Sequence, residues 1–201
     1  MKFAALSVRK RYMQERDDID QVAKLLLSGG IICYPTDTIW GIGCDVRRTD
    51  AIERINKLKG RPPGKAYVLL VSSIDMLKDY VKTLHPRIET LLNYHQRPLT
   101  IIYPEARNLP PEAVAPDGSV AIRVTRSRLC RELIEAIGAP LVSTSANVSG
   151  QPYPKNFGEI SSEIIENVDY VSKENRWDLS DAQPSTIAIA TENGILEFVR
   201  P

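Results

Sequence analysis

The strongest constraint on the fold is the alternation of helical and strand-like apolar patterns along the chain. Apolar side chains recur at helical spacing over residues 18–28, and a short buried-strand pattern follows at 31–34. The same order returns with helices near 50–59, 72–81, 86–94 and 127–137, and with strands near 67–71, 99–103, 119–125 and 140–143. This alternation predicts an α/β sheet flanked by helices.

The last part of the chain predicts a hairpin. Strand-like segments at 186–190 and 195–199 flank Asn193-Gly194, a pair that suits a tight hairpin turn. An antiparallel hairpin added to helix-connected strands gives a twisted, open, mixed sheet. No repeat or convincing linker divides the chain, so we expect one domain over residues 1–201.

Turn and cap residues predict where individual helices begin and end. Thr49 or Asp50 stands where the second helix needs an N-cap, and Gly60 stands where a left-handed C-cap would end it. Ser72 or Ser73 is the expected cap of the following helix. A later helix is expected to run from Ser127 to Ile137 and to be closed by Gly138.

Charge and cysteine content limit the classes of partner. The net charge is +1 over 201 residues, so affinity for nucleic acid would have to come from a local basic patch. Cys33, Cys44 and Cys130 are odd in number and lack the paired spacing of a zinc site. With no signal-peptide pattern and no membrane-length apolar run, we expect reduced thiols and a cytoplasmic protein.

Three polar segments stand where a strand or helix ends: residues 34–38, 59–65 and 143–150. Ligand sites in open α/β sheets lie at such ends. The second holds three cations within a Pro- and Gly-rich stretch and is typical of an anion clamp, although a solvated basic loop has the same composition. The third offers hydroxyls and an amide to phosphate, carboxylate or ribose, or is a Ser-rich turn that caps a helix.

Absent motifs narrow the chemistry further. The chain has no P-loop and no G-x-G-x-x-G segment, and its only histidines, His85 and His95, favour structural roles. Catalysis would therefore depend on cations, hydroxyls and a bound metal.

Taken in order and spacing, six segments resemble the YrdC-like (YrdC/YciO) family of threonylcarbamoyl-AMP synthases. They are YPTDTIWGIGCD, KGRPPGK, RPLTIIYP, VAIRV, PLVSTSANVSG and PSTIAIA, and the likeness spans residues 31–200. The most specific part is the pairing of K-x-R at Lys59 and Arg61 with S-x-N at Ser145 and Asn147. The chain resembles the short form, which lacks an extra carboxy-terminal domain.

The resemblance implies a large, basic, concave cavity and a nucleotidyltransferase reaction. L-Threonine, bicarbonate and ATP with Mg²⁺ would give threonylcarbamoyl-AMP, pyrophosphate and water. A separate tRNA threonylcarbamoyl transferase would use this product for the t6A modification of adenosine 37. The implied protein is a monomer or weak dimer with no dedicated metal ligands and no membrane partner.

The resemblance also implies residue roles. Lys59 and Arg61 would be catalytic, stabilising charge that develops at the α-phosphate. Contacts to threonine or the adenylate are implied for Thr36, Thr100, Ser145 and Asn147. Nucleotide contacts are implied for Lys65, Arg123, Ser143, Ser185 and Arg200.

The chain departs from the family pattern at two places. Residues 94–100 read YHQRPLT where the family has W-P-G-P-x-T, and Ala66-Tyr67 follow Lys65 where the family has P-L. Arg97 would either narrow the threonine pocket or supply a further carboxylate contact. The departure therefore bears on the threonine pocket and not on the fold.

Two alternatives stay open at this stage. The first is a YciO-branch protein without synthase activity that binds nucleotide or double-stranded RNA through its basic cavity, with affinity that falls steeply with salt. The second is a carbamoyl-adenylate former like the one embedded in hydrogenase maturation proteins.

Overall fold

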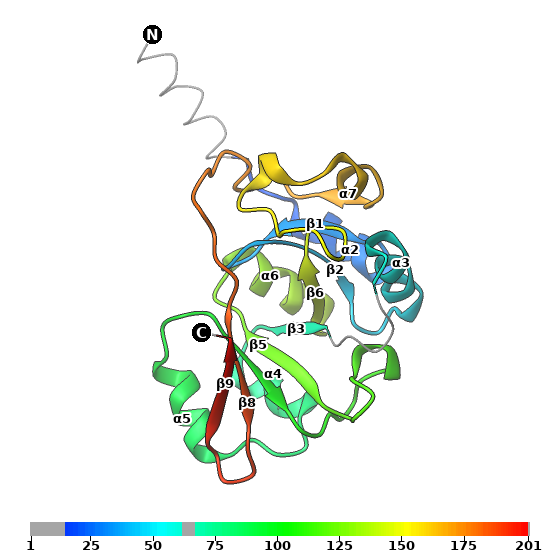
Figure 1. The fold of residues 1–201 in the computed structure, drawn as a ribbon. Helices are drawn as coiled ribbons and strands as arrows, with labels where there is room; N and C mark the ends of the chain where they lie inside the picture. Colours follow the sequence, from blue (N-terminus) through cyan, green and yellow to red (C-terminus); the bar gives the residue numbers. More distant parts are fainter. Residues whose placement is uncertain (1–14, 62–66, 201) are drawn as a thin grey trace.

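A computed structural model describes residues 15–61 and 67–200, which contain one nine-stranded sheet (Figure 1). The strand order is β7-β1-β2-β6-β3-β5-β4-β8-β9. The strands are β1 Ile32–Pro35, β2 Trp40–Asp45, β3 Val68–Val71, β4 Leu99–Tyr103, β5 Val120–Val124, β6 Leu141–Ser145, β7 Tyr170–Val171, β8 Thr186–Ala190 and β9 Leu196–Arg200.

Six α-helices belong to the described part of the chain, together with two single 3₁₀ turns, Pro111–Ala113 and Phe157–Glu159. The helices are α2 Ile19–Leu27, α3 Thr49–Lys59, α4 Ile74–Tyr80, α5 Pro86–Tyr94, α6 Arg128–Ile137 and α7 Ser162–Glu166. None of the helices so described has the length and apolarity to cross a membrane.

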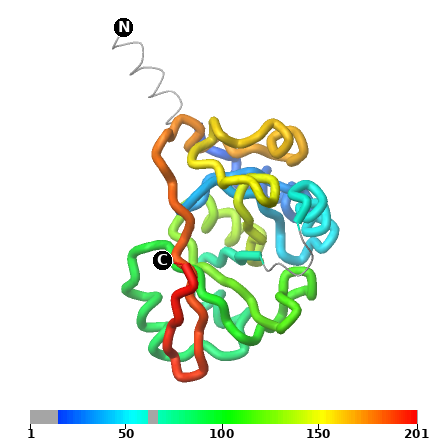
Figure 2. Tube along the Cα trace, viewed as in Figure 1, coloured from blue at the N-terminus to red at the C-terminus, as the bar shows by residue number. Residues whose placement is uncertain are grey.

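The sheet is mixed, as the sequence predicts. Three neighbouring pairs are parallel, β1 with β7, β3 with β5, and β4 with β8, and the other five are antiparallel. The predicted hairpin is confirmed as β8–β9, where Gly194 has φ 72° and donates its N–H to the Thr191 carbonyl at 3.0 Å. Figure 2 shows residues 172–185 crossing from β7 at one edge of the sheet toward β8 near the other edge.

Several predicted helix ends are confirmed. Ser73 caps α4 by accepting from the Met76 N–H, and Ser127 caps α6 by accepting from the Cys130 N–H. Gly60 and Gly138 end α3 and α6 in the left-handed conformation that a C-cap requires.

The predicted cap of α3 is wrong. Thr49 and Asp50 both lie inside the helix, and Arg48 occupies the N-cap position without a side-chain cap bond. The Arg48 guanidinium pairs with the Asp50 carboxylate at 2.8 Å and donates to the Leu27 carbonyl. Asp50 therefore lies two positions after the N-cap, in the first turn of the helix.

Strand periodicity separates the two faces of the sheet. On β5, Ile122 points into the core and Arg123 to the opposite face. Helix α2 packs on α6, α6 on β3, and α4 on β3 and β5, so the core lies between these helices and the apolar face. The other face carries the polar residues of the site.

Candidate active site

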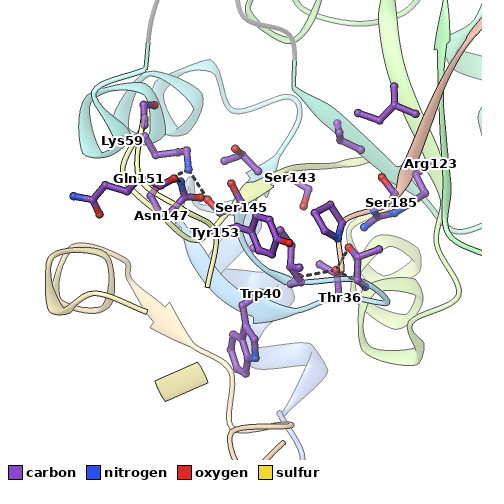
Figure 3. A pocket seen from close by; sticks show the side chains of 18 of the residues that line it. Thr36, Trp40, Lys59, Arg123, Ser143, Ser145, Asn147, Gln151, Tyr153 and Ser185 are labelled. Atoms are coloured by element: carbon purple, nitrogen blue, oxygen red, sulfur yellow. Dashed lines mark hydrogen bonds between the residues drawn. The ribbon is translucent and has the colours of Figure 1, made fainter. Parts of the chain in front are cut away.

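The polar face of the sheet opens into a cavity of about 360 Å³ (Figure 3). Its cationic lining residues are Lys59, Arg61, Arg123 and Arg200. No aspartate or glutamate lines it within residues 15–61 and 67–200. Fixed positive charge without a lining carboxylate suits a ligand that carries several negative charges.

Two glycines of β2 allow it to pair closely with β6, and one of them, Gly41, lines the cavity. Gly41 and Gly43 lie directly opposite Ser145 and Ser143 of β6 on the same face of the sheet. A Cβ at Gly43 would lie 2.1 Å from the Val142 carbonyl oxygen, and one at Gly41 would lie 3.3 Å from the Ser143 hydroxyl. The absence of side chains therefore both permits close strand packing and keeps the serines accessible.

The turn from β1 to β2 is built by hydroxyl groups. Thr36 Oγ1 donates to the Ile39 carbonyl at 2.8 Å and accepts from the Thr38 N–H at 3.0 Å. Both threonines line the cavity. The turn thus fixes the hydroxyl of Thr36 at the cavity wall.

Lys59 joins the end of α3 to the loop after β6. Its side chain is 2% exposed, and its ammonium donates to the carbonyls of Ser145 and Asn147. The Ser149 N–H donates to the Lys59 carbonyl at 2.8 Å. The K-x-R and S-x-N segments, more than eighty residues apart, are thereby held together as one unit.

Asn147 is oriented by its own loop. Its side-chain amide donates to the carbonyls of Val148 and Gln151 at 2.9 and 2.8 Å. Its Oδ1 has no hydrogen-bond partner within the described part of the chain. The residue lines the cavity, whereas this oxygen is itself buried.

Arg61 lies on an aromatic ring. Its guanidinium carbon is 4.3 Å from the centre of the Tyr67 ring, and its Nη1 is 3.5 Å from Thr144 Oγ1. The Tyr67 hydroxyl donates to Asn56 Oδ1 at 2.6 Å, which fixes the ring. Burial lowers the pKa of Arg61, but an arginine remains charged at neutral pH.

The far side of the cavity holds the other two arginines, and Lys59 and Arg123 enter it from opposite sides in Figure 3. Arg200 donates two hydrogen bonds to the Ser185 carbonyl, at 3.0 and 2.7 Å. Burial, and then the like charge of Arg123, lower the pKa of Arg200. The mutual repulsion of two cations indicates a place where an anion would be favoured.

The predicted site residues converge with two exceptions. Nine of them line this cavity: Thr36, Lys59, Arg61, Arg123, Ser143, Ser145, Asn147, Ser185 and Arg200. Thr100 is fully buried outside the lining and shares a hydrogen bond of 2.8 Å with Ser185. Lys65 lies outside the described residues.

The sequence pattern missed other lining residues. Trp40, Gln151 and Tyr153 line the cavity, and the Trp40 ring lies 5.0 Å from that of Phe157. Gln151 and Tyr153 directly follow the third polar segment, so a wider window would have found them. Trp40 belongs to β2, which apolar periodicity did not reveal because two glycines interrupt it.

The segment that departs from the family pattern lies beside the cavity. Arg97 is exposed and does not belong to the lining. The Arg126 guanidinium holds this segment by donating to Gln96 Oε1 at 3.0 Å and to the His95 carbonyl. The altered residues His95 and Gln96 are therefore held by Arg126, which follows β5 and is not a lining residue.

The cysteine thiols form one group of potentially reactive side chains, and possible metal ligands form another. Cys33, Cys44 and Cys130 are free and buried, and burial raises the pKa of each to about 12. No group of three or more His, Cys, Asp or Glu side chains suited to a metal occurs in residues 15–61 and 67–200.

Comparisons with known proteins agree on one family. A sequence model of the Sua5/YciO/YrdC family, described as "Telomere recombination", matches residues 24–201. A threonylcarbamoyl-AMP synthase of Xanthomonas euvesicatoria pv. vesicatoria is 34% identical over 187 residues, which are 92% of this chain and 99% of that protein.

Solved structures share the fold. P. abyssi Sua5 complexed with L-threonine has a TM-score of 0.79 at 24% identity, over 91% of this chain and 53% of that one. E. coli YciO has a TM-score of 0.76 at 23% identity, over 91% of this chain and 90% of that one. The matched length, the identity to full-length relatives and the shared fold establish that this chain belongs to the Sua5/YciO/YrdC family.

Proposed function

We propose that this protein is a threonylcarbamoyl-AMP synthase that converts L-threonine, bicarbonate and ATP into threonylcarbamoyl-AMP, pyrophosphate and water. The observation that carries the proposal is the cavity lined by four cations and by no carboxylate of the described chain. The synthase relative that is 34% identical and matched over 99% of its length supports the same reaction.

The chemistry explains why such a lining is needed. Bicarbonate and the threonine amine first give N-carboxythreonine with loss of water. An oxygen of the new N-carboxylate (carbamate) group then attacks the α-phosphorus of ATP, and the bond from that phosphorus to pyrophosphate breaks. Two anionic reactants must approach each other, so Lys59 and Arg61 would offset their repulsion and stabilise charge in the transition state. Arg61 offers a two-pronged grip on carboxylate or phosphate.

The other lining residues would bind either threonine or the nucleotide, according to the side of the cavity on which they lie. Thr36, Ser145 and Asn147 would contact threonine or the adenylate. Ser143, Ser185, Arg123 and Arg200 would bind the nucleotide. Lys65 would add a phosphate contact. Thr100 would act through Ser185, to which it is hydrogen-bonded.

Magnesium would enter with its nucleotide. The lining offers hydroxyls and amides but no carboxylate from the described residues. Mg²⁺ is commonly held by substrate phosphates and water in such sites, so it would be bound together with ATP and would supply positive charge that stabilises the leaving pyrophosphate.

The product would pass to a tRNA threonylcarbamoyl transferase, which would complete the t6A modification. Three free, buried thiols agree with a reducing compartment, and we assign the protein to the cytoplasm as a monomer or weak dimer.

The product itself provides the test. Protein incubated with ATP, Mg²⁺, ¹³C-bicarbonate and L-threonine should form an adenylate whose mass contains both the label and threonine. L-Serine should give much less. If only unreacted ATP is found, while salt-sensitive binding of a double-stranded RNA is measured, the non-synthase alternative replaces this proposal.

A further inference from the structure

Arg123 is a buried cation with one ion-pair partner in the described part of the chain. Its side chain is 6% exposed, yet the residue lines the cavity. Its Nη2 lies 3.2 Å from Asp37 Oδ1, and its Nε has no hydrogen-bond partner within the described part of the chain. Among residues 15–61 and 67–200, Asp37 is the only ion-pair partner of Arg123.

Asp37 is itself held in place from the other side. Its Oδ2 accepts the main-chain N–H of Arg126 at 3.1 Å, and its side chain is only 11% exposed. Arg126 also bonds Gln96 and His95. The carboxylate is therefore anchored by one oxygen to the backbone after β5, and its other oxygen is directed toward Arg123.

Asp37 lies next to the cavity but is not one of its lining residues. Its neighbours Thr36 and Thr38 both line the cavity, whereas Asp37 does not. A carboxylate this close to a phosphate site opposes anion binding through its charge, so a purely electrostatic account predicts that removing the charge strengthens nucleotide binding. A geometric account predicts the opposite, because an arginine without its partner no longer points at the phosphate.

We propose that Asp37 is a positioning residue, which fixes the Arg123 guanidinium for contact with the nucleotide phosphates. This inference rests on the proposed function, because it takes Arg123 to be a nucleotide contact. It also gives the segment 95–96 a role, since Arg126 ties that segment to the backbone group that anchors Asp37.

The test compares Asp37→Asn with wild-type protein by calorimetric titration of Mg·ATP in the absence of amino acid. Asparagine keeps an acceptor for the Arg126 N–H but removes the charge that orients Arg123. We expect the dissociation constant to rise about tenfold. An unchanged or lower dissociation constant would overturn the proposal.

A matched control distinguishes positioning from general destabilisation. Asp45 is 1% exposed and pairs with Arg47 at 2.6 Å, outside the cavity lining. Asp45→Asn should lower the thermal midpoint without changing ATP affinity. If Asp45→Asn weakens ATP binding as much as Asp37→Asn does, the effect is not specific to Asp37.

Two further variants keep the proposal testable if Asp37→Asn folds poorly. Asp37→Glu retains the charge on a longer side chain and should recover part of the ATP affinity. In an Arg123→Ala background, Asp37→Asn should change ATP affinity by less than twofold, because its effect passes through Arg123. A full-sized effect in that background would contradict the proposal.

The wild-type titration distinguishes a failure of the role given to Asp37 from a failure of the proposed function. If wild-type protein binds Mg·ATP and Asp37→Asn binds it equally well, only the role of Asp37 fails. If wild-type protein shows no ATP binding, the proposed function fails and this inference fails with it.

Discussion

Thr100 Oγ1 and Ser185 Oγ lie 2.8 Å apart behind the wall of the cavity, although 85 residues separate them in the chain. Both residues are buried, and Thr100 opposes Ile187 in the parallel pairing of β4 with β8. The hydrogen bond fixes the Ser185 hydroxyl, which lines the cavity together with Arg200.

Thr100→Val should weaken nucleotide binding with little effect on threonine. The variant keeps the shape of the side chain but leaves Ser185 without its partner, which costs about 1 kcal/mol and corresponds to about a fivefold higher KM for ATP. Steady-state kinetics with each substrate varied in turn measures the effect. Thr100→Ser retains the hydroxyl and is the control, and a larger change in the KM for threonine would contradict this role.

Lys59→Met should lose both activity and stability. Its ammonium donates to the carbonyls of Ser145 and Asn147. Without Lys59 the Ser145 carbonyl still accepts from the Asn147 N–H, but the Asn147 carbonyl loses this donor, so we expect a loss of about 1–3 kcal/mol in the free energy of unfolding. The loss of positive charge should lower kcat/KM by about 100-fold or more. Urea denaturation and pyrophosphate assays measure the two effects. Lys57→Met, at an exposed position of the same helix, should change neither.

Gly43→Ala should destabilise the sheet strongly. The added Cβ would lie 2.1 Å from the Val142 carbonyl oxygen, so β2 and β6 would have to separate. We expect a loss of about 2 kcal/mol or more in the free energy of unfolding. A Cβ at Gly158 would lie 3.3 Å from the side-chain oxygen of Asn156. Gly158→Ala should therefore lower the free energy of unfolding much less than Gly43→Ala does. Equal midpoints for the two variants would show that β2 and β6 separate readily.

Stability should fall above pH 9 because of the buried thiols. Cys33, Cys44 and Cys130 have an ordinary pKa of 9.0 that burial raises to about 12. Below pH 9 the native and unfolded thiols are both protonated. Between pH 9 and about 12 the unfolded chain releases protons that the native protein retains, so each thiol lowers stability by about 1.4 kcal/mol per pH unit.

Urea denaturation at pH 8 and pH 10 measures this dependence. Cys130→Ala should reduce the difference between the two pH values by the contribution of one thiol. A free energy of unfolding that does not change between these pH values would contradict the burial of the thiols.

Local signals account for the parts of the fold that the sequence predicts. Ser73, Ser127, Gly60 and Gly138 act at helix ends through their own backbone and side-chain chemistry, so their positions are readable from the chain. The Asn193-Gly194 turn is local in the same sense. The strand order is not readable, because it depends on non-local pairings such as β2 with β6.

The elements that escaped prediction have weak local patterns. Strand β2 carries Gly41 and Gly43, which interrupt its apolar pattern, although all six of its residues are buried. Strand β7 has two residues and helix α7 has five, too few for a period to appear. The role of Asp37 is also not readable from the sequence, because it depends on a contact with Arg123, which is 86 positions away in the chain.

The central claim is that the cationic cavity joins threonine to adenylate, and pyrophosphate release tests it most directly. Wild-type protein with ATP, Mg²⁺ and bicarbonate should release pyrophosphate when L-threonine is added and much less with L-serine or no amino acid. Arg61→Ala should abolish the threonine-dependent release while its unfolding midpoint stays close to that of the wild type. Release that does not depend on threonine, or that persists unchanged in Arg61→Ala, would contradict the account.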